Sequence, residues 1–243
     1  MKFYCSLVLY FLAFPLVAQN YSGKVLYKQK MEVPLLQDDH TMEAELFKEA
    51  AERTEVFTYD LVFNGEESLF QVEEFMNNDA NSLETMALRI SGGRGVYYKS
   101  SNSINTLHQR NSFGETIVLE LPGTRYVWKL TDESKKIGKF TVYKAAATVV
   151  HKAPVAHLKD KTVHIEAWFA PEIPVCFGPK DINGLPGLVL QAKIGNVTFT
   201  ATEVHIEKDA SDALVINIPE GKQMNLKELD ARARRIVAKG LLD

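Results

Sequence analysis

The sequence predicts a mainly β protein, built on an antiparallel sheet that is strongly curved or barrel-like, with one early helix and one C-terminal helix. Short runs of alternating apolar and polar residues recur at intervals of about ten residues through most of the chain. Pairs such as Asn-Gly and Pro-Gly, which favour turns, separate several of these runs. Helical apolar spacing is confined to 38–53 and 225–239, so a doubly wound fold is not expected.

The first predicted elements are a strand and a helix. Residues 23–32 alternate apolar side chains with lysines, which is typical of a strand. Residues 38–53 carry apolar side chains at four-residue spacing and predict a helix. Asp38 or Asp39 is placed to cap the start of this helix.

A hairpin follows the predicted helix. Residues 55–63 alternate apolar and polar side chains, and residues 68–74 form a second strand-like run. Asn64-Gly65 lies between the two runs and favours a tight turn. The apolar face of the first run consists of Phe57, Tyr59, Leu61 and Phe63.

The middle of the chain predicts a loop and then a series of strands. Residues 75–93 are polar and rich in asparagine, and they predict a long loop. Short β-rich runs follow at 95–100, 103–109, 115–121, 124–130, 138–150 and 162–171. Two more runs, 187–194 and 196–208, meet at Gly195-Asn196 and predict another tight hairpin.

The end of the chain has helical spacing. Residues 225–239 predict a helix that docks on the sheet. Asn225 with Glu228 three positions later resembles a capping box, and Gly240 suits the C-terminal cap.

The N-terminus indicates export. Lys2 precedes an apolar run over 3–17, and small Ala18 is followed by polar residues, as in a secretory signal peptide cut after residue 18. The apolar run is shorter than the roughly 20 residues that a membrane-spanning helix needs. We therefore expect a signal peptide at 1–18, a single β-rich domain at 19–243 and no transmembrane segment after cleavage.

The composition of the mature chain narrows the classes of function. It would carry 27 basic and 31 acidic residues, a formal charge of −4, without a basic block. This charge argues against nucleic acid as a partner. Cys176 would be the one remaining cysteine, which excludes an intramolecular disulfide and a multi-cysteine zinc site.

Two groups of histidine and glutamate are candidate metal ligands. His164 and Glu166 lie two positions apart and so share a face of one predicted strand. The same spacing joins Glu203, His205 and Glu207 on another strand. Pairing of these strands in register would form a zinc or copper set, as in a metal-dependent hydrolase. The alternative is that these residues form the solvent faces of amphipathic strands, which needs no cofactor.

Other chemical features have both a structural and a functional interpretation. The chain contains no Gly-rich phosphate loop and no HExxH, GxSxG or CxxC motif. Cys176 would need to be a thiolate to act as a nucleophile, but its apolar neighbours favour a small buried hydrophobe. Trp128 and Trp168, with the tyrosines at 97, 98, 126 and 143, either line a ligand groove or pack within a sheet.

Residues 171–191, PEIPVCFGPKDINGLPGLVLQ, concentrate prolines and glycines. Pro171 and Pro174 prevent the preceding strand from continuing as a central strand. Pro186-Gly187 fits the central positions of a type II turn, in which Gly187 takes a positive φ. The segment is therefore predicted to be a rigid connector that reverses the chain and pins leucines in the core. Its structural residues are Trp168, Pro171, Pro174, Gly178, Pro179, Gly184, Leu185, Pro186, Gly187 and Leu188.

This region resembles the GLPGLI family of exported proteins from Bacteroidota-type bacteria. Residues 184–189 read GLPGLV, with Val189 in place of the family's final isoleucine. Further matching elements occur in order over 124–206: Trp128, Ile137-Gly138, Lys144-Ala145, Ala167-Trp168 and the run PEIPVCFGP. Val142 stands where family members often carry a cysteine. The resemblance implies an exported antiparallel β fold but no established reaction, so no catalytic residues are carried over.

These observations predict an exported cell-envelope protein with a non-enzymatic binding or structural role. Its expected location is periplasmic, outer-membrane-associated or extracellular, and its expected partner is an envelope protein, a lipid or a small ligand. The alternative is the metal-dependent hydrolase that uses the histidines and glutamates on the strands. The two classes differ in whether those residues converge in one cleft.

Overall fold

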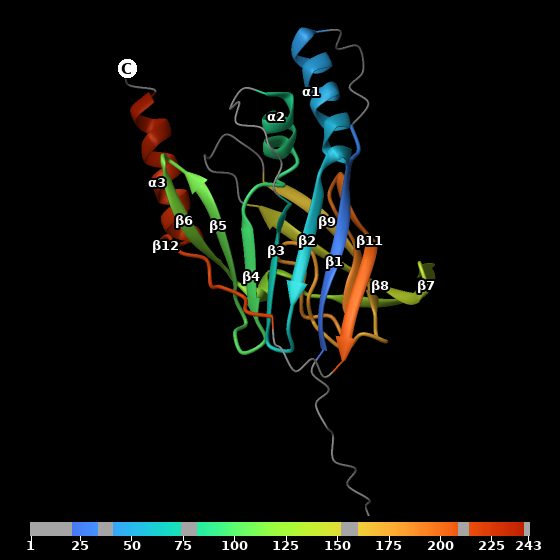
Figure 1. The fold of residues 1–243 in the computed structure, drawn as a ribbon. Helices are drawn as coiled ribbons and strands as arrows, with labels where there is room; N and C mark the ends of the chain where they lie inside the picture. Colours follow the sequence, from blue (N-terminus) through green and yellow to red (C-terminus); the bar gives the residue numbers. More distant parts are fainter. Residues whose placement is uncertain (1–20, 34–40, 74–81, 152–159, 209–213, 241–243) are drawn as a thin grey trace, which may run out of the picture.

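The computed structural model describes residues 21–33, 41–73, 82–151, 160–208 and 214–240 (Figure 1). The described strands are β1 Tyr21–Met31, β2 Thr58–Phe63, β3 Glu67–Val72, β4 Val96–Ser100, β5 Thr106–Ser112, β6 Glu115–Leu121, β7 Lys129–Ile137, β8 Phe140–His151, β9 Lys161–Ala170, β10 Leu188–Ile194, β11 Val197–Lys208 and β12 Lys222–Asn225. The helices are α1 Met42–Glu52, α2 Leu83–Ile90 and α3 Leu226–Gly240, with short 3-10 helices at Arg53–Val56 and Gly123–Arg125. The predicted signal peptide lies outside the described residues.

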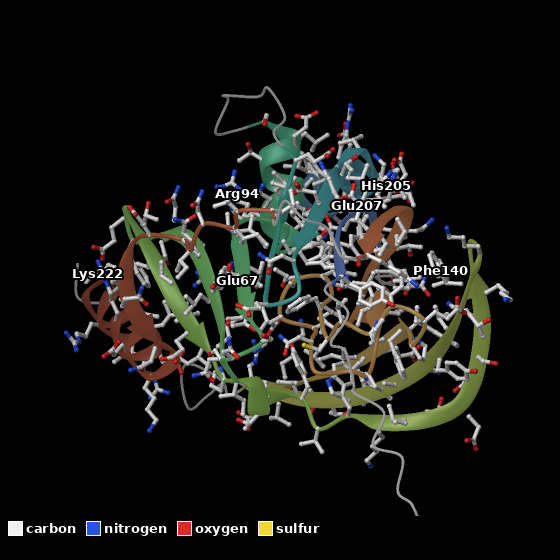
Figure 2. All side chains as sticks on the ribbon, turned by 60° about the horizontal axis from the view of Figure 1, so that its bottom comes forward. Glu67, Arg94, Phe140, His205, Glu207 and Lys222 are labelled. Atoms are coloured by element: carbon white, nitrogen blue, oxygen red, sulfur yellow. The ribbon has the colours of Figure 1, made fainter. Side chains whose placement is uncertain are left out.

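The described strands form one sheet in the order β12-β6-β5-β4-β3-β2-β1-β11-β10-β9-β8-β7. Neighbouring strands pair antiparallel except β12 and β6, which are parallel. The sheet is open, so the barrel-like alternative is not realised. Figure 2 confirms strong curvature: the yellow-green β7 and β8 sweep round the base, and the connection that follows β9 lies inside the curve.

The two predicted hairpins, β2–β3 and β10–β11, are confirmed. The face predicted to be apolar is buried from Phe57 to Phe63. The Asn64 side chain holds the first turn, because its Oδ1 accepts from the backbone N–H groups of Glu66 at 3.0 Å and Glu67 at 2.7 Å. An asparagine that bonds to the backbone two and three residues later stabilises a turn locally, which is why this hairpin is visible in the sequence.

The prediction of a loop at 75–93 is wrong over its second half, where α2 forms. Ser82 caps this helix by accepting from the backbone N–H of Thr85 at 3.2 Å. Ala87 and Leu88 of α2 are buried in the core, and Figure 1 places α2 beside α1 at one end of the sheet. Tertiary packing stabilises a helix of eight residues that is too short to form alone.

Several predicted boundaries also change. The strand predicted at 124–130 is wrong over most of its length, because a 3-10 helix occupies 123–125 and β7 begins at Lys129. The strand predicted at 103–109 is β5, displaced to 106–112. Thr41 caps α1 by accepting from the N–H of Ala44 at 3.2 Å, so the cap is neither Asp38 nor Asp39, which lie outside the described residues. The short parallel strand β12 was not predicted.

The C-terminal helix is confirmed, together with its capping box. The Asn225 side chain accepts from the N–H of Glu228 at 3.0 Å, and the Glu228 carboxylate accepts from the N–H of Asn225 at 2.9 Å. Leu226 and Leu229 then turn toward the first hydrophobic core. None of the helices that the structure describes is both long and apolar enough to cross a membrane.

The interior contains two hydrophobic cores, and residues 171–187 contact both. Ile173, Val175 and Phe177 are buried in the first core, with residues from β1, β2 and β11. Ile182 and Leu185 are buried in the second core, with residues from β8, β9 and β10. We call residues 171–187 the plug, because they fill the inside of the curved sheet. The prediction of a rigid connector that pins leucines therefore describes this segment in outline.

Backbone hydrogen bonds within the plug and from β10 satisfy several of its polar groups, as burial of a loop requires. The N–H of Gly184 donates to the carbonyl of Cys176 at 3.0 Å, and the N–H of Leu188 donates to the carbonyl of Ile173 at 3.0 Å. The predicted type II turn is not formed, because this second bond takes the Leu188 N–H. Instead the Gly187 N–H donates to the Leu185 carbonyl at 2.9 Å, which closes a three-residue turn around Pro186.

Gly187 is required by both its backbone conformation and its surroundings. Its φ is 155°, and a Cβ placed there would lie 2.4 Å from the carbonyl oxygen of Ala170. We expect Gly187→Val to destabilise the fold by about 1–3 kcal/mol, because the strain and the clash must both be relieved. The measurement is thermal and urea-induced unfolding of the two proteins.

Gly138→Asn is the matched control for this substitution. Gly138 also has a positive φ, 55°, but no atom lies within 4 Å of the position of its Cβ. Asparagine tolerates this backbone region, so the control should unfold close to the original protein. Unchanged unfolding of Gly187→Val would show that the plug yields easily at this position.

Candidate functional site

The structure places the first predicted metal group on β9. The Nδ1 atom of His164 lies 3.4 Å from the hydroxyl of Thr148, and the Glu166 carboxylate lies 3.6 Å from the ammonium of Lys144. His164 is exposed and Glu166 is half-buried. Both residues therefore face neighbours on β8.

The second predicted metal group lies on β11, and β10 separates it from the first. The side chains of Glu203, His205 and Glu207 are exposed, and His205 Nε2 lies 3.3 Å from a carboxylate oxygen of Glu203 (Figure 2). The register that would join the two groups is not formed. Among the described residues, no three histidine, cysteine, aspartate or glutamate side chains are grouped so that they would hold a metal ion.

The aromatic residues divide between packing and a cavity. Tyr126 and Trp128 pack with ring centroids 5.4 Å apart, and the indole N–H of Trp128 donates to the carbonyl of Asn183 at 3.0 Å. The ammonium of Lys135 lies 4.0 Å from the ring centroid of Trp168. Tyr97 and Tyr126 line a cavity, as the ligand-groove interpretation requires of them. Cys176 is half-buried and packs against the first core, as a small hydrophobe would.

A cavity of about 1080 Å³ opens between the end of α2, β4 and the β5–β6 hairpin. Four cationic residues line it, and we call it the basic cavity: Arg89, Arg94, Arg110 and Lys180 (Figure 2 labels Arg94). Among the described residues that line it, none is aspartate or glutamate. Within the described part of the chain, none of the four cations forms an ion pair. The Nε of Arg110 is buried without a hydrogen-bond partner.

Lys180 comes from the plug and has an unusual backbone. Its φ is 58°, in the left-handed region that residues other than glycine seldom adopt. Its ammonium lies 5.7 Å from the ring centroid of Tyr97 and 6.0 Å from that of Phe199. Burial lowers the pKa of Lys180, and Asp181 opposes this shift. Backbone strain of this kind persists where the surrounding structure enforces it, often at binding sites.

Asp181 is held by other partners next to the cavity. One of its carboxylate oxygens accepts from the guanidinium of Arg125 at 2.6 Å and from the hydroxyl of Tyr126 at 2.8 Å. These bonds occupy the carboxylate that lies nearest to Lys180 in the sequence. Lys180 itself forms no ion pair within the described residues.

His108 is stacked on Tyr97 at the floor of the cavity. The ring centroids lie 4.0 Å apart with an angle of 9° between the planes, and His108 Nε2 lies 3.4 Å from the carbonyl oxygen of Arg94. Burial lowers the pKa of His108 to about 4, and the positive charge of Arg110 lowers it further. Gly95 permits the close approach, because a Cβ there would lie 2.6 Å from His108 Nε2. His108 is therefore neutral at physiological pH.

A second cavity of about 690 Å³ adjoins the first, and we call it the α3 cavity because Leu226 and Leu229 of α3 line one side of it. The two cavities share four residues, Tyr97, His108, Arg110 and Lys180. None of these residues was predicted to bind charge. They come from β4, β5 and the plug, which are separate in the sequence, so no local motif marks them.

A family model described as "Protein of unknown function (Porph_ging)" matches residues 128–191, about a quarter of the chain. That range includes the plug. The family description does not use the GLPGLI name, so the resemblance through 184–189 stays a prediction. No curated protein matches the chain.

Two solved structures are distantly similar to this chain, "Structure of PNGF-II in C2 space group" and "Structure of PNGF-II in P21 space group". Each has a TM-score of 0.48 and covers 89% of this chain, at 16% and 15% identity. The match covers 32% and 33% of those chains, so this chain spans about a third of their length. At this similarity no functional property is transferred from them.

The lowered pKa of His108 predicts an acid-dependent loss of stability. The unfolded chain takes up a proton near pH 6.5, whereas the native ring does so only near pH 4. Stability is therefore complete above pH 6.5 and falls as the pH drops toward 4, by up to about 3 kcal/mol. Urea unfolding measured across this pH range tests the slope.

His108→Phe keeps a ring face against Tyr97 and removes the titration, so this variant should lose that part of the slope. The matched control is His205→Gln, whose side chain is exposed and which should keep the slope of the original protein. An unchanged slope in His108→Phe would contradict the assignment to His108.

Proposed function

We propose that this chain is an exported cell-envelope protein that binds a small anionic molecule in the basic cavity without catalysing a reaction. One observation carries the proposal: four cationic side chains line the cavity, and within the described part of the chain none of them forms an ion pair with a carboxylate. The whole sequence is slightly acidic, with a net charge of −3, so this cluster is not a sample of a generally basic surface.

Unpaired cations in a concave site favour an anionic ligand. Removing a cation from water costs free energy that a counter-charge with hydrogen bonds can offset. Burial lowers the pKa of Lys180, and a bound anion would oppose this shift. The guanidinium groups match the geometry of carboxylate or phosphate, to which they can donate two parallel hydrogen bonds.

The Nε of Arg110, which has no hydrogen-bond partner, also supports a bound anion. A buried donor without a partner is uncommon in native structures and calls for an explanation. A ligand oxygen would satisfy it. The face of Tyr97, stacked on neutral His108, supplies an apolar surface beside these donors. Cavities that combine apolar surface with a few convergent polar groups are typical of small-molecule sites.

Export and the GLPGLI relationship are part of this proposal. The support for export is Lys2, the apolar run at 3–17 and Ala18 in the sequence. The support for the relationship is the run GLPGLV together with its ordered upstream elements. A binding role suits a protein of the envelope that meets its ligand outside the cytoplasm.

The test of anion binding compares two ligands of the same shape. Benzoate and the neutral benzamide are titrated into the protein and followed by NMR chemical shifts, which detect millimolar affinities. We expect benzoate to bind at least about tenfold tighter, with an affinity that falls as salt is added. Arg110→Gln and Lys180→Met should each remove the preference for benzoate.

Lys48→Gln on the exposed face of α1 is the control, because it makes the same change in charge far from the cavity lining. Lys180→Met keeps the aliphatic stem and removes an ammonium that burial disfavours, so its thermal midpoint should not fall. Equal affinities for benzoate and benzamide, or a preference that survives both cavity variants, would overturn the proposal.

Export has its own test. When the full chain is expressed in a diderm bacterium, the mature protein is expected to begin at Gln19 and to leave the cytoplasm. Intact mass and cell fractionation measure both properties. A cytoplasmic protein that retains residues 1–18 would contradict export without affecting the binding proposal.

A further inference from the structure

We infer that the ligand is a single-chain anionic amphiphile, whose head group lies at Arg110 and Lys180 and whose alkyl chain lies in the α3 cavity. This inference rests on the proposed anion binding and names the class of ligand. An independent observation supports it: the basic cavity and the α3 cavity share lining residues.

The two cavities meet at the cations. Tyr97, His108, Arg110 and Lys180 line both, so the basic cavity and the α3 cavity adjoin at these residues. An anion held by Arg110 and Lys180 therefore lies next to the α3 cavity. Any extension of the ligand has two directions available, toward the polar lining of the basic cavity or toward α3.

Part of the wall of the α3 cavity is aliphatic. Val149, Val163 and Ile194 project from β8, β9 and β10 and are partly buried against the second core. Leu226 and Leu229 of α3 are partly buried against the first core on the other side. The cavity is thus the gap between the two hydrophobic cores, and its apolar walls are only partly covered by protein.

Two of the charged residues that line the α3 cavity, Arg110 and Lys180, also line the basic cavity. Arg125 and Asp181 also line it, but they pair with each other at 2.6 Å. Asp230 of α3 is the other acidic residue of the lining. A ligand without a tail would leave the aliphatic walls in water, and a ligand without an anionic head would leave Arg110 and Lys180 uncompensated. An anionic amphiphile satisfies both ends, because alkyl burial is favourable in proportion to the area removed from water.

The experiment measures the contributions of the alkyl chain and of the head group to binding separately. Acetate, octanoate and dodecanoate share one head group, and dodecanol is the neutral counterpart of the longest. They are titrated by calorimetry below the concentrations at which they form micelles. We expect dodecanoate to bind more than about tenfold tighter than octanoate, and dodecanol to bind more than about tenfold weaker than dodecanoate.

Variants locate the two ends. Val163→Thr is nearly isosteric and places a hydroxyl in the wall, so it should weaken dodecanoate binding several-fold and leave benzoate binding unchanged. Leu229→Asp should weaken dodecanoate binding more. If Leu229→Asp fails to fold, as its melting curve would show, Val163→Thr decides alone. Arg110→Gln should weaken dodecanoate binding as it weakens benzoate binding.

The outcomes distinguish this inference from the proposed function. If dodecanoate binds no tighter than octanoate while benzoate remains preferred over benzamide, the amphiphile is wrong and anion binding stands. If dodecanol binds as tightly as dodecanoate, the head-group assignment is wrong. If neither benzoate nor any carboxylate of the series binds in preference to its neutral counterpart, both proposals fail.

Discussion

The burial of the plug inside the curved sheet is the constraint on which the rest of the structure depends. Twelve strands bent around one segment leave two hydrophobic cores, and Phe177 and Leu185 of the plug lie in different ones. The segment can be buried because backbone bonds, such as Gly184 to Cys176 within it and Leu188 of β10 to Ile173, satisfy several of its polar groups. A further bond fixes β10, the strand that follows the plug. The buried hydroxyl of Tyr27 on β1 donates to the carbonyl of Val189 at 2.6 Å.

The same segment delivers the charge of the candidate site. Lys180 follows Pro179 in the plug and takes a left-handed backbone conformation, with its ammonium near the rings of Tyr97 and Phe199. A lysine on an exposed loop would extend into solvent, whereas this one lines a cavity. The gap between the two cores, which the plug does not fill, becomes the α3 cavity. The fold and the candidate site therefore both depend on how the plug occupies the inside of the sheet.

Local chemistry explains which parts of the fold could be predicted. The Asn64 turn and the capping box of Asn225 and Glu228 are bonds between residues two or three positions apart, so the sequence displays them directly. Helix α2 escaped prediction because its stability comes from packing on the core, and β12 because it forms only by pairing with β6. The metal candidates failed to meet for a comparable reason: strand order, which the sequence does not display, inserts β10 between them.

The sequence alone therefore determined the β class, the hairpins, the terminal helix and the position of the rigid connector, because each follows from periodicity, proline and glycine chemistry or capping within a few residues. Only the tertiary structure decided that this connector is a buried plug. It also decided that Arg89, Arg94, Arg110 and Lys180 share one cavity, whose described lining contains no aspartate or glutamate. The physical reason is that a charge cluster is set by distances in space, and the four cations come from segments that meet only when the sheet curves around the plug.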